Sequence, residues 1–255
     1  AQGMMMFVSE DEKNWIMFGS RNGEGVDNTS EGNAPFVIKC VNGVRTLVDE
    51  DTQTWGGGYH GYNWDIQTDG NTITWTVAEE GTNLTWTDSY TDTDGIISAE
   101  WKYPCAAYSI GDGWGYVYNA QMWYKAAKNW GEPNFTENFA NYTADDIQYN
   151  SSNNYYRLGD GVKTIATNPS GAKWVTSSEW KSLNGDGKVF VNYKDGRMGI
   201  NGCSSGWTSS INLDMGDVKI DKLERLTFKT STDNRAQGMM MFVSEDEKNW
   251  IMFGS

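Results

Sequence analysis

The sequence contains short runs in which apolar and polar residues alternate, separated by turn residues, and this is the pattern of antiparallel β-strands. Residues 72–77 place three apolar side chains on one face of a strand and three threonines on the other. Residues 84–87 repeat the pattern after a short polar connection. We therefore expect these two segments to pair, and residues 96–103 to supply a third strand.

A hairpin is predicted at the start of the chain. Residues 4–8 and 15–18 are apolar, and they flank a charged connection of hairpin length at residues 9–14. Three consecutive methionines open this segment. Because adjacent strand residues face opposite sides, such a run requires both faces of the strand to be covered, as in a strand held between neighbours.

Turn signals recur along the rest of the chain. Residues 36–41 and 44–48 flank Asn42-Gly43, the dipeptide typical of a two-residue type I′ turn, and should form a second hairpin. Further turns are expected at six Asp-Gly dipeptides, which begin at Asp69, Asp94, Asp112, Asp160, Asp186 and Asp195.

The remaining segments indicate an all-β protein. Residues 125–155 are Asn-rich and irregular, and one helical turn is expected near 221–225. We predict an antiparallel β-sandwich of jelly-roll type with long loops and little helix, built either as one large sandwich or as two packed β domains. Further strands are expected at residues 116–118, 122–124, 161–166, 173–180, 188–193 and twice within 209–228.

The opening segment occurs twice. Residues 1–20, AQGMMMFVSEDEKNWIMFGS, return unchanged as residues 236–255, an offset of 235 positions. Old duplicated copies would have diverged, so three explanations remain. The chain is one period plus an overlap of near-identical tandem repeats, or it carries an engineered duplication as in circular permutants, or one copy is a donor segment that competes with its twin for one position. We treat Ala1 as a cut point.

The repeat suggests an organisation of the chain. Residues 1–20 would be a connector or a donated element, and residues 21–125 a β domain or the first half of one large sandwich. Residues 126–160 would form an irregular Asn-rich loop region. Residues 161–255 would be the second β part, closed by the second copy of the hairpin, which we expect to hold the native position in this domain.

Composition excludes several partners. Net charge is −14, from 34 acidic and 20 basic residues, so nucleic acid and acidic membrane surfaces would be repelled. No apolar block is long enough to span a membrane. The aromatic fraction of 14% and the acidic surface instead suit neutral polysaccharide, divalent cations or simple solubility, and no organic cofactor is expected.

Cysteines and glycosylation sequons bear on the compartment. Cys40, Cys105 and Cys203 lack zinc-site spacing, so they are either one disulfide with a leftover thiol in an exported protein or three small buried residues in a reducing compartment. An extracellular or cell-surface location would allow N-glycosylation. Sequons begin at Asn28, Asn83, Asn134, Asn141 and Asn150.

Part of the chain has a family-like pattern. The run INLDMG at 211–216 is similar to an Ile-Asp-Leu-Gly-like strand, and an apolar segment follows at 223–228. The run SEDEKNW at 244–250 is similar to a strand ending in Ser-x-Asp-Gly-x-x-Trp, with Glu247 in place of the glycine. Residues 211–255 therefore resemble discoidin domains and related galactose-binding β-sandwich modules. The resemblance implies a discoidin-like sandwich of the carbohydrate-recognition kind and includes no sugar-binding position.

A Gly- and aromatic-rich loop is the candidate carbohydrate site. In residues 54–64, aromatic faces could stack on a pyranose while glycines let the backbone approach. The alternative is a loop whose aromatic side chains fill the end of the core. The candidate sugar-binding residues are Trp55, Tyr59, His60, Tyr62 and Trp64.

Acidic residues are weaker candidates, for catalysis or for calcium binding, than the aromatic loop is for carbohydrate binding. Glu100, expected within a strand, is the one candidate for a glycoside-hydrolase acid, with a solvent-facing strand residue as the alternative. Two acidic clusters could each bind Ca²⁺, and the alternative is that both are charged turns. The candidate calcium ligands are Asp49, Asp51, Asp92 and Asp94.

Three functions are therefore carried forward. The first is a non-enzymatic extracellular structural protein, a repeating subunit that contacts copies of itself head-to-tail in a β-rich fibre, filament or surface layer. The second is a carbohydrate-binding module or lectin for neutral glycans, and the third a glycoside hydrolase. The candidate assembly residues are Met4, Met5, Met6, Phe7, Val8, Trp15, Ile16, Met17 and Phe18.

Overall fold

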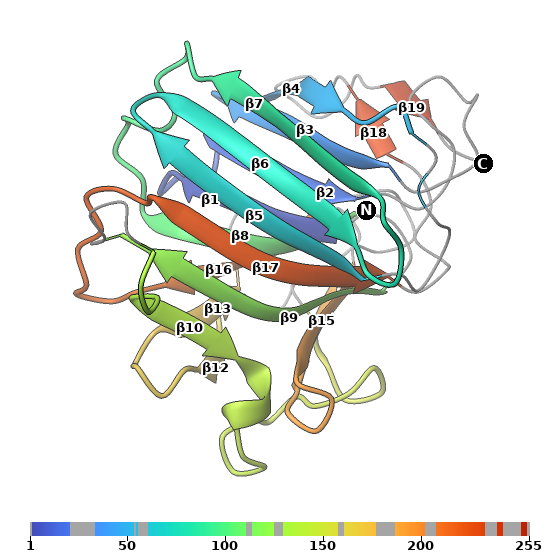
Figure 1. The fold of residues 1–255 in the computed structure, drawn as a ribbon. Helices are drawn as coiled ribbons and strands as arrows, with labels where there is room; N and C mark the ends of the chain where they lie inside the picture. Colours follow the sequence, from blue (N-terminus) through green and yellow to red (C-terminus); the bar gives the residue numbers. More distant parts are fainter. Residues whose placement is uncertain are drawn as a thin grey trace.

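Two antiparallel β-sheets pack face to face in the computed structural model of the protein, with the nine-stranded sheet in front in Figure 1 and the eight-stranded sheet behind it. The structure describes residues 2–20, 34–53, 55, 61–110, 114–124, 130–157, 161–176, 187–201, 208–232, 239–241 and 251–253. The predicted antiparallel β-sandwich is confirmed.

The eight-stranded sheet places the first two strands of the chain in its middle. Its order is β12 (Thr164–Thr167), β13 (Lys173–Thr176), β16 (Thr208–Asp214), β8 (Tyr103–Ile110), β1 (Gln2–Val8), β2 (Trp15–Ser20), β3 (Pro35–Val41) and β4 (Val44–Glu50).

The nine-stranded sheet is built around the long strand β9. Its order is β11 (Tyr156–Arg157), β14 (Lys188–Asn192), β15 (Arg197–Asn201), β9 (Trp114–Trp123), β17 (Arg225–Thr232), β5 (Tyr62–Asp69), β6 (Thr72–Glu79) and β7 (Thr85–Thr91), with β10 (Phe135–Asn138) also paired to β9. Each sheet takes strands from both halves of the chain, so the halves do not form separate sheets.

The main core lies between the sheets and is rich in aromatic side chains. Phe18 meets Trp64 and Trp75 at ring-centroid distances of 6.2 and 6.0 Å, and all three are at most 2% exposed. A second apolar cluster includes two residues from each of β1 and β2, which point to the opposite face of the eight-stranded sheet. Its buried members are Met5, Val8, Trp15, Met17, Phe36, Ile38, Cys40, Ala106 and Tyr108.

The predicted hairpins are confirmed. β1 pairs with β2, β3 with β4, and β6 with β7, all antiparallel. Asn42 and Gly43 both have positive φ, 52° and 84°, as a type I′ turn requires. Residues 116–118 and 122–124 were expected as separate strands, but 116–118, 122 and 123 belong to the single strand β9, which ends before residue 124.

Two local predictions are wrong. Residues 96–98 form a turn and the strand starts only at Tyr103, because the Asp92 carboxylate accepts hydrogen bonds from the backbone N–H groups of Asp94 and Ile97 and so holds a turn there. Residues 221–224 contain no helical turn, and β17 begins at Arg225. Among the described residues the one helix is a short 3₁₀ turn, η1 (Phe139–Asn141), inside the segment predicted to be irregular.

Strand β5 was missed, although its burial alternates strictly between core and solvent from Tyr62 to Asp69. Strands β10, β11 and β15 were also missed. Within the described part of the chain, no helix is long and apolar enough to cross a membrane.

Candidate functional site

The first hairpin fills a position between β8 and β3, which we call the hairpin slot. Gln2 pairs with Ser109 on β8, and Ser20 pairs with Pro35 on β3, so the hairpin is hydrogen-bonded along both outer edges. Every candidate assembly residue is at most 1% exposed. The eight-stranded sheet is therefore continuous only while a hairpin occupies the slot.

The three methionines confirm that both faces of β1 are covered. Met4 and Met6 lie in the main core, whereas Met5 lies in the cluster on the opposite face. Gly3 has a steric role, since a Cβ at this position would overlap the carbonyl oxygen of Phe18 on the neighbouring strand. The strand is thus fitted to close neighbours on both sides and both faces.

The connection between β1 and β2 is anchored to a strand 200 residues away. Glu12 has φ of 58° and is 5% exposed, and its Oε1 accepts a hydrogen bond of 2.8 Å from Nδ2 of Asn212 on β16. In the second copy the equivalent residue is Glu247, which stands where the discoidin-like pattern has glycine. Positive φ favours glycine, so the buried carboxylate contact offsets the strain of a non-glycine residue here.

The second copy of the hairpin lies outside both large sheets. β18 (Met239–Met241) and β19 (Ile251–Phe253) pair with each other in a separate two-stranded sheet. Their register, Met239 with Phe253, repeats the pairing of Met4 with Phe18 at an offset of 235. The second copy was expected to hold the native position in this domain, whereas in this structure the first copy occupies the slot.

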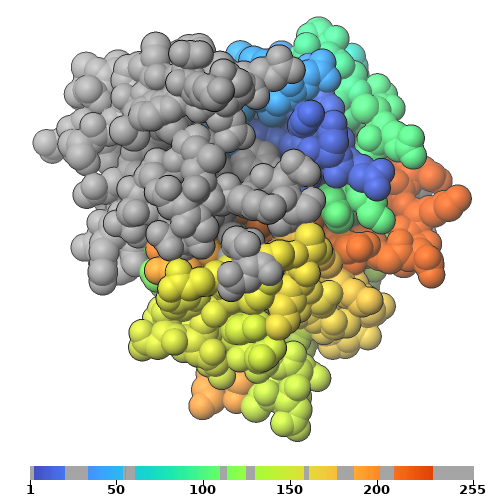
Figure 2. All heavy atoms as spheres, turned by 180° about the vertical axis from the view of Figure 1, so that it is seen from behind, coloured from blue at the N-terminus to red at the C-terminus, as the bar shows by residue number. Residues whose placement is uncertain are grey.

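Figure 2 shows the molecule from behind, where the dark-blue atoms of the first copy lie beside the lighter blue atoms of β3 and β4. Residues 10, 11 and 13 of the connection are exposed there, whereas the strands themselves are buried. Of residues 3–20, those exposed to solvent all lie in the connection.

The candidate carbohydrate residues that the structure describes are core residues. Trp55, Tyr62 and Trp64 are at most 2% exposed. Trp55 donates from Nε1 to Oδ2 of Asp51 at 2.6 Å, and Trp64 stacks on Phe228 at 5.9 Å. These three rings present no face to a sugar, which agrees with the alternative of core aromatics. Tyr59 and His60 lie outside the described residues.

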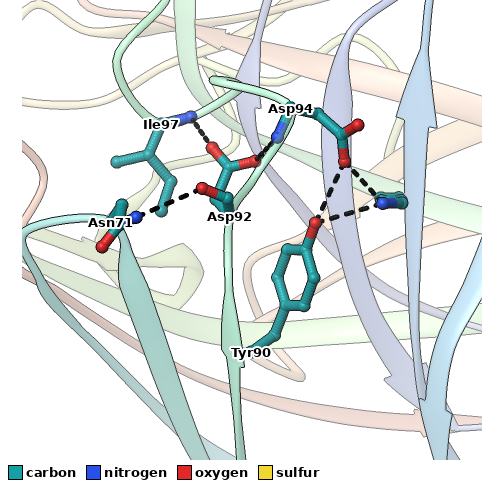
Figure 3. Close-up of polar contacts among 6 residues, drawn as sticks. Asn71, Tyr90, Asp92, Asp94 and Ile97 are labelled. Atoms are coloured by element: carbon teal, nitrogen blue, oxygen red, sulfur yellow. Dashed lines mark hydrogen bonds and ion pairs between the residues drawn. The ribbon is translucent and has the colours of Figure 1, made fainter.

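The candidate calcium ligands Asp92 and Asp94 are occupied within a turn, as Figure 3 shows. Besides its bonds to the turn N–H groups, Asp92 accepts one through its backbone carbonyl from Asn71, and it is 4% exposed. Asp94 accepts hydrogen bonds from Nζ of Lys39 and from the hydroxyl of Tyr90, and these contacts lower its pKa, Lys39 more strongly. The pair fits a charged turn that ties β3 to β7.

The other two calcium candidates also have local partners. Asp51 accepts from Trp55 and from the backbone N–H of Gln53. Asp49 on β4 shares a hydrogen bond with Asp88 on β7, and β4 and β7 are the end strands of the two sheets. Among the described residues, no group of three or more His, Cys, Asp or Glu side chains could hold a metal ion.

Partial burial, together with the charge of Asp88, raises the pKa of Asp49 from 3.8 to about 6. The folded protein thus binds this proton more tightly than the unfolded chain, and the resulting stability is complete below pH 3.8 and lost as pH rises through about 6. Asp49→Asn should therefore be more stable than the wild type at pH 8, by no more than about 1 kcal/mol because the pair is largely solvated, and should differ little at pH 4. Urea unfolding at both pH values measures this. Asp88→Asn removes the neighbouring charge but not the burial of Asp49, so it should give a smaller change in the same direction. Parallel pH dependence in the wild type and Asp49→Asn would contradict the raised pKa of Asp49.

Glu100 is exposed and lies outside the strands, so the reason for selecting it as a strand-borne acid does not hold. The sequon asparagines Asn83, Asn134, Asn141 and Asn150 are all exposed, and Asn28 lies outside the described residues.

The two described cysteines are buried free thiols. Cys40 and Cys105 do not bridge, and Cys203 lies outside the described residues. Burial raises the pKa of the Cys40 thiol to about 11 and that of Cys105 further. Neither is a reactive thiolate at neutral pH.

Sequence reasoning missed a row of rings on β9. Tyr116, Tyr118 and Trp123 alternate with core residues and point away from the main core. Cations lie 4.1 to 5.0 Å from the ring centroids, supplied by Arg197, Lys229 and Arg225, respectively. Carboxylates pair with these cations, namely Asp195, Glu80 and Asp65, respectively. Ring and cation come from different strands, so no local pattern could reveal them.

A buried carboxyl group was also missed. Glu137 on β10 is 0% exposed, and its Oε2 accepts hydrogen bonds from Nε1 of Trp174 at 2.7 Å and from the hydroxyl of Tyr142 at 3.1 Å. Burial raises its pKa, and the hydrogen bonds from Trp174, Asn168 and Tyr142 partly counter that effect. Glu137 ties the two sheets together, since Trp174 lies on β13 of the opposite sheet.

No protein-family model matches the chain, and no curated protein matches its sequence.

Proposed function

We propose that the chain is a non-enzymatic structural protein, a β-sandwich unit that repeats head-to-tail in a β-rich fibre, filament or surface layer. One observation carries the proposal: two identical hairpins pair in one register, one inside the eight-stranded sheet and one outside both sheets. In this proposal residues 1–235 are one unit, and residues 236–255 open the next.

Energetics support a hairpin in every unit. Nine apolar side chains of the first copy are buried. At about 1.5–3 kcal/mol for each large side chain, their burial is worth on the order of 20 kcal/mol. That exceeds the net stability of a typical domain, about 5–15 kcal/mol, so a sandwich with an empty slot would not remain folded.

The second copy must also bury its apolar side chains to be stable. An isolated two-stranded hairpin is marginally stable in water, and its three methionines need cover on both faces. A following unit of the same sequence would supply the same neighbours, β8 and β3. The contact joins different surfaces of successive units, so it does not close on itself and can propagate.

An extracellular or cell-surface location is part of the proposal. Four exposed sequon asparagines are compatible with it, because glycans added there would project into solvent without disturbing the core.

Extending the chain beyond Ser255 with a second copy of residues 21–235 should produce a second folded sandwich. We expect the calorimetric enthalpy of unfolding to become about twice that of the original chain, because this enthalpy scales with the number of folded residues. The same extension carrying Phe253→Asp is the matched control, and its enthalpy should stay near that of one unit. An extension that remains unfolded with an intact second hairpin would refute the array. The natural coding sequence should likewise continue with Arg-Asn-Gly-Glu-Gly, as it does after Ser20.

A further inference from the structure

We infer that either copy of the hairpin can close the same sandwich, so that residues 236–255 can enter the slot of their own chain from its C-terminal side. The inference rests on the proposed function, in which a hairpin of this sequence completes each unit. The proposed binding site of the second copy is the hairpin slot between β8 and β3.

The two possible entry points lie at the same rim of the sandwich. β1 begins at Gln2, opposite Ser109 near the end of β8. β17 ends at Thr232, opposite Gly115 near the start of β9. Only residues 111–113 connect β8 to β9, so the start of β1 and the end of β17 are at the same end of the molecule. Figure 1 shows the arrowhead of β17 on the side where the N-terminus is marked.

The chain between β17 and the second copy is long enough to make the crossing. Cα atoms of β1 and β17 approach within 8 Å across the core. Gln237 is the equivalent of Gln2 and follows Thr232 by five residues. Five extended residues span up to about 17 Å, against a sheet separation of about 10 Å.

The contacts in the slot do not distinguish the copies, because the two sequences are identical. Phe253 would take the place of Phe18 against Trp64 and Trp75, and Glu247 that of Glu12 beside Asn212. Trp250 would replace Trp15, over whose ring the Arg45 guanidinium lies at 5.5 Å. Only the path of the connecting chain differs between the two occupants.

A shared hairpin has a consequence for an array. In an array of such units, each internal hairpin is adjacent to two slots, that of the unit before it and that of the unit after it. When the first hairpin of a unit is absent, the hairpin that follows its β17 can fill the slot. Neither β8 nor β3 is then left as an open sheet edge.

Matched substitutions in the two copies test the inference in the full chain. Phe18→Asp places a charge in the main core if the first copy stays in the slot, and Phe253→Asp does the same to the second copy. We expect each single variant to be a folded monomer with a melting temperature within about 5 °C of the wild type, and the double variant to be unfolded. Because the substitution makes the two copies differ in mass, hydrogen exchange read by mass spectrometry identifies the protected one. In Phe18→Asp it should be residues 236–255.

Two results would overturn the inference. Phe18→Asp could unfold while Phe253→Asp behaves as the wild type, which would mean that only the first copy fits. Phe18→Asp could instead form concentration-dependent oligomers on light scattering, which would mean that the slot is filled from another molecule. Both results leave the proposed array intact, since its test uses the extended chain.

Discussion

Glu137→Ala should be among the most destabilising single substitutions in the protein. The change leaves Nε1–H of Trp174 and the hydroxyl of Tyr142 without their acceptor inside the core. A buried donor without a partner costs about 1–3 kcal/mol, so we expect a loss of about 4 kcal/mol and a fall in melting temperature of about 10 °C. Calorimetry at pH 6 measures the difference. A melting temperature within about 2 °C of the wild type would show that the carboxyl group does not hold the two sheets together.

Glu137→Gln separates the role of the acceptor from that of the charge. The amide oxygen can still accept from Trp174 and Tyr142. The wild-type pKa is raised above its usual 4.5, so the stability that Glu137 contributes is complete below pH 4.5 and declines as pH rises through the folded-state pKa. Glutamine has no such decline. The variant should therefore gain stability relative to the wild type between pH 4 and pH 8, whereas Glu137→Ala should stay well below it at both pH values.

Sequence patterns correctly predicted those features whose structure is determined by residues close together in the sequence. Asn42-Gly43 fixes its hairpin because both residues adopt positive φ without help from the rest of the fold. The consecutive methionines predicted cover on both faces of their strand for a similar reason, since the alternation of a strand is a property of its backbone. Both predictions are confirmed.

Predictions failed where side-chain hydrogen bonds decide the structure. Asp92 holds residues 96–98 in a turn by accepting hydrogen bonds from the N–H groups of Asp94 and Ile97, so the expected strand starts only at Tyr103. The partner of Glu12 is Asn212, and no spacing in the sequence joins the two. Glu137 carries no local signal either, because its hydrogen-bond partner Trp174 comes from the opposite sheet.

The same limit applies to the choice between the two hairpins. Their sequences are identical, so the sequence could not indicate which one lies between β8 and β3. The family-like block favoured the second copy because it is continuous with residues 211–228, yet the first copy fills the slot. The end of β17 lies at the rim where β1 begins, so the second copy, which follows β17, can also reach the slot. Either copy can therefore serve as the closing element.

The Trp64→Ala variant should have a lower free energy of unfolding than the wild type, and it should not lose a sugar-binding surface. Trp64 is 2% exposed, stacks on Phe228 and meets the edge of Phe18. Truncating a buried tryptophan to alanine costs about 3–5 kcal/mol, because the lost contacts leave a cavity in the core. Urea denaturation should show a lower midpoint with an unchanged slope.

Trp130→Ala is the matched control for this prediction. Trp130 is partly exposed, lies against Trp123 at 6.3 Å and has the Arg225 guanidinium over its ring at 5.4 Å. A contact of this kind at the surface is worth about 1 kcal/mol or less, so this variant should remain close to the wild type. A Trp64→Ala protein with wild-type stability that loses retention on a glycan column would reverse the conclusion, because it would place the ring in a binding surface. If instead Trp64→Ala alone is destabilised, Trp64 is part of the core that packs against the hairpin in its slot.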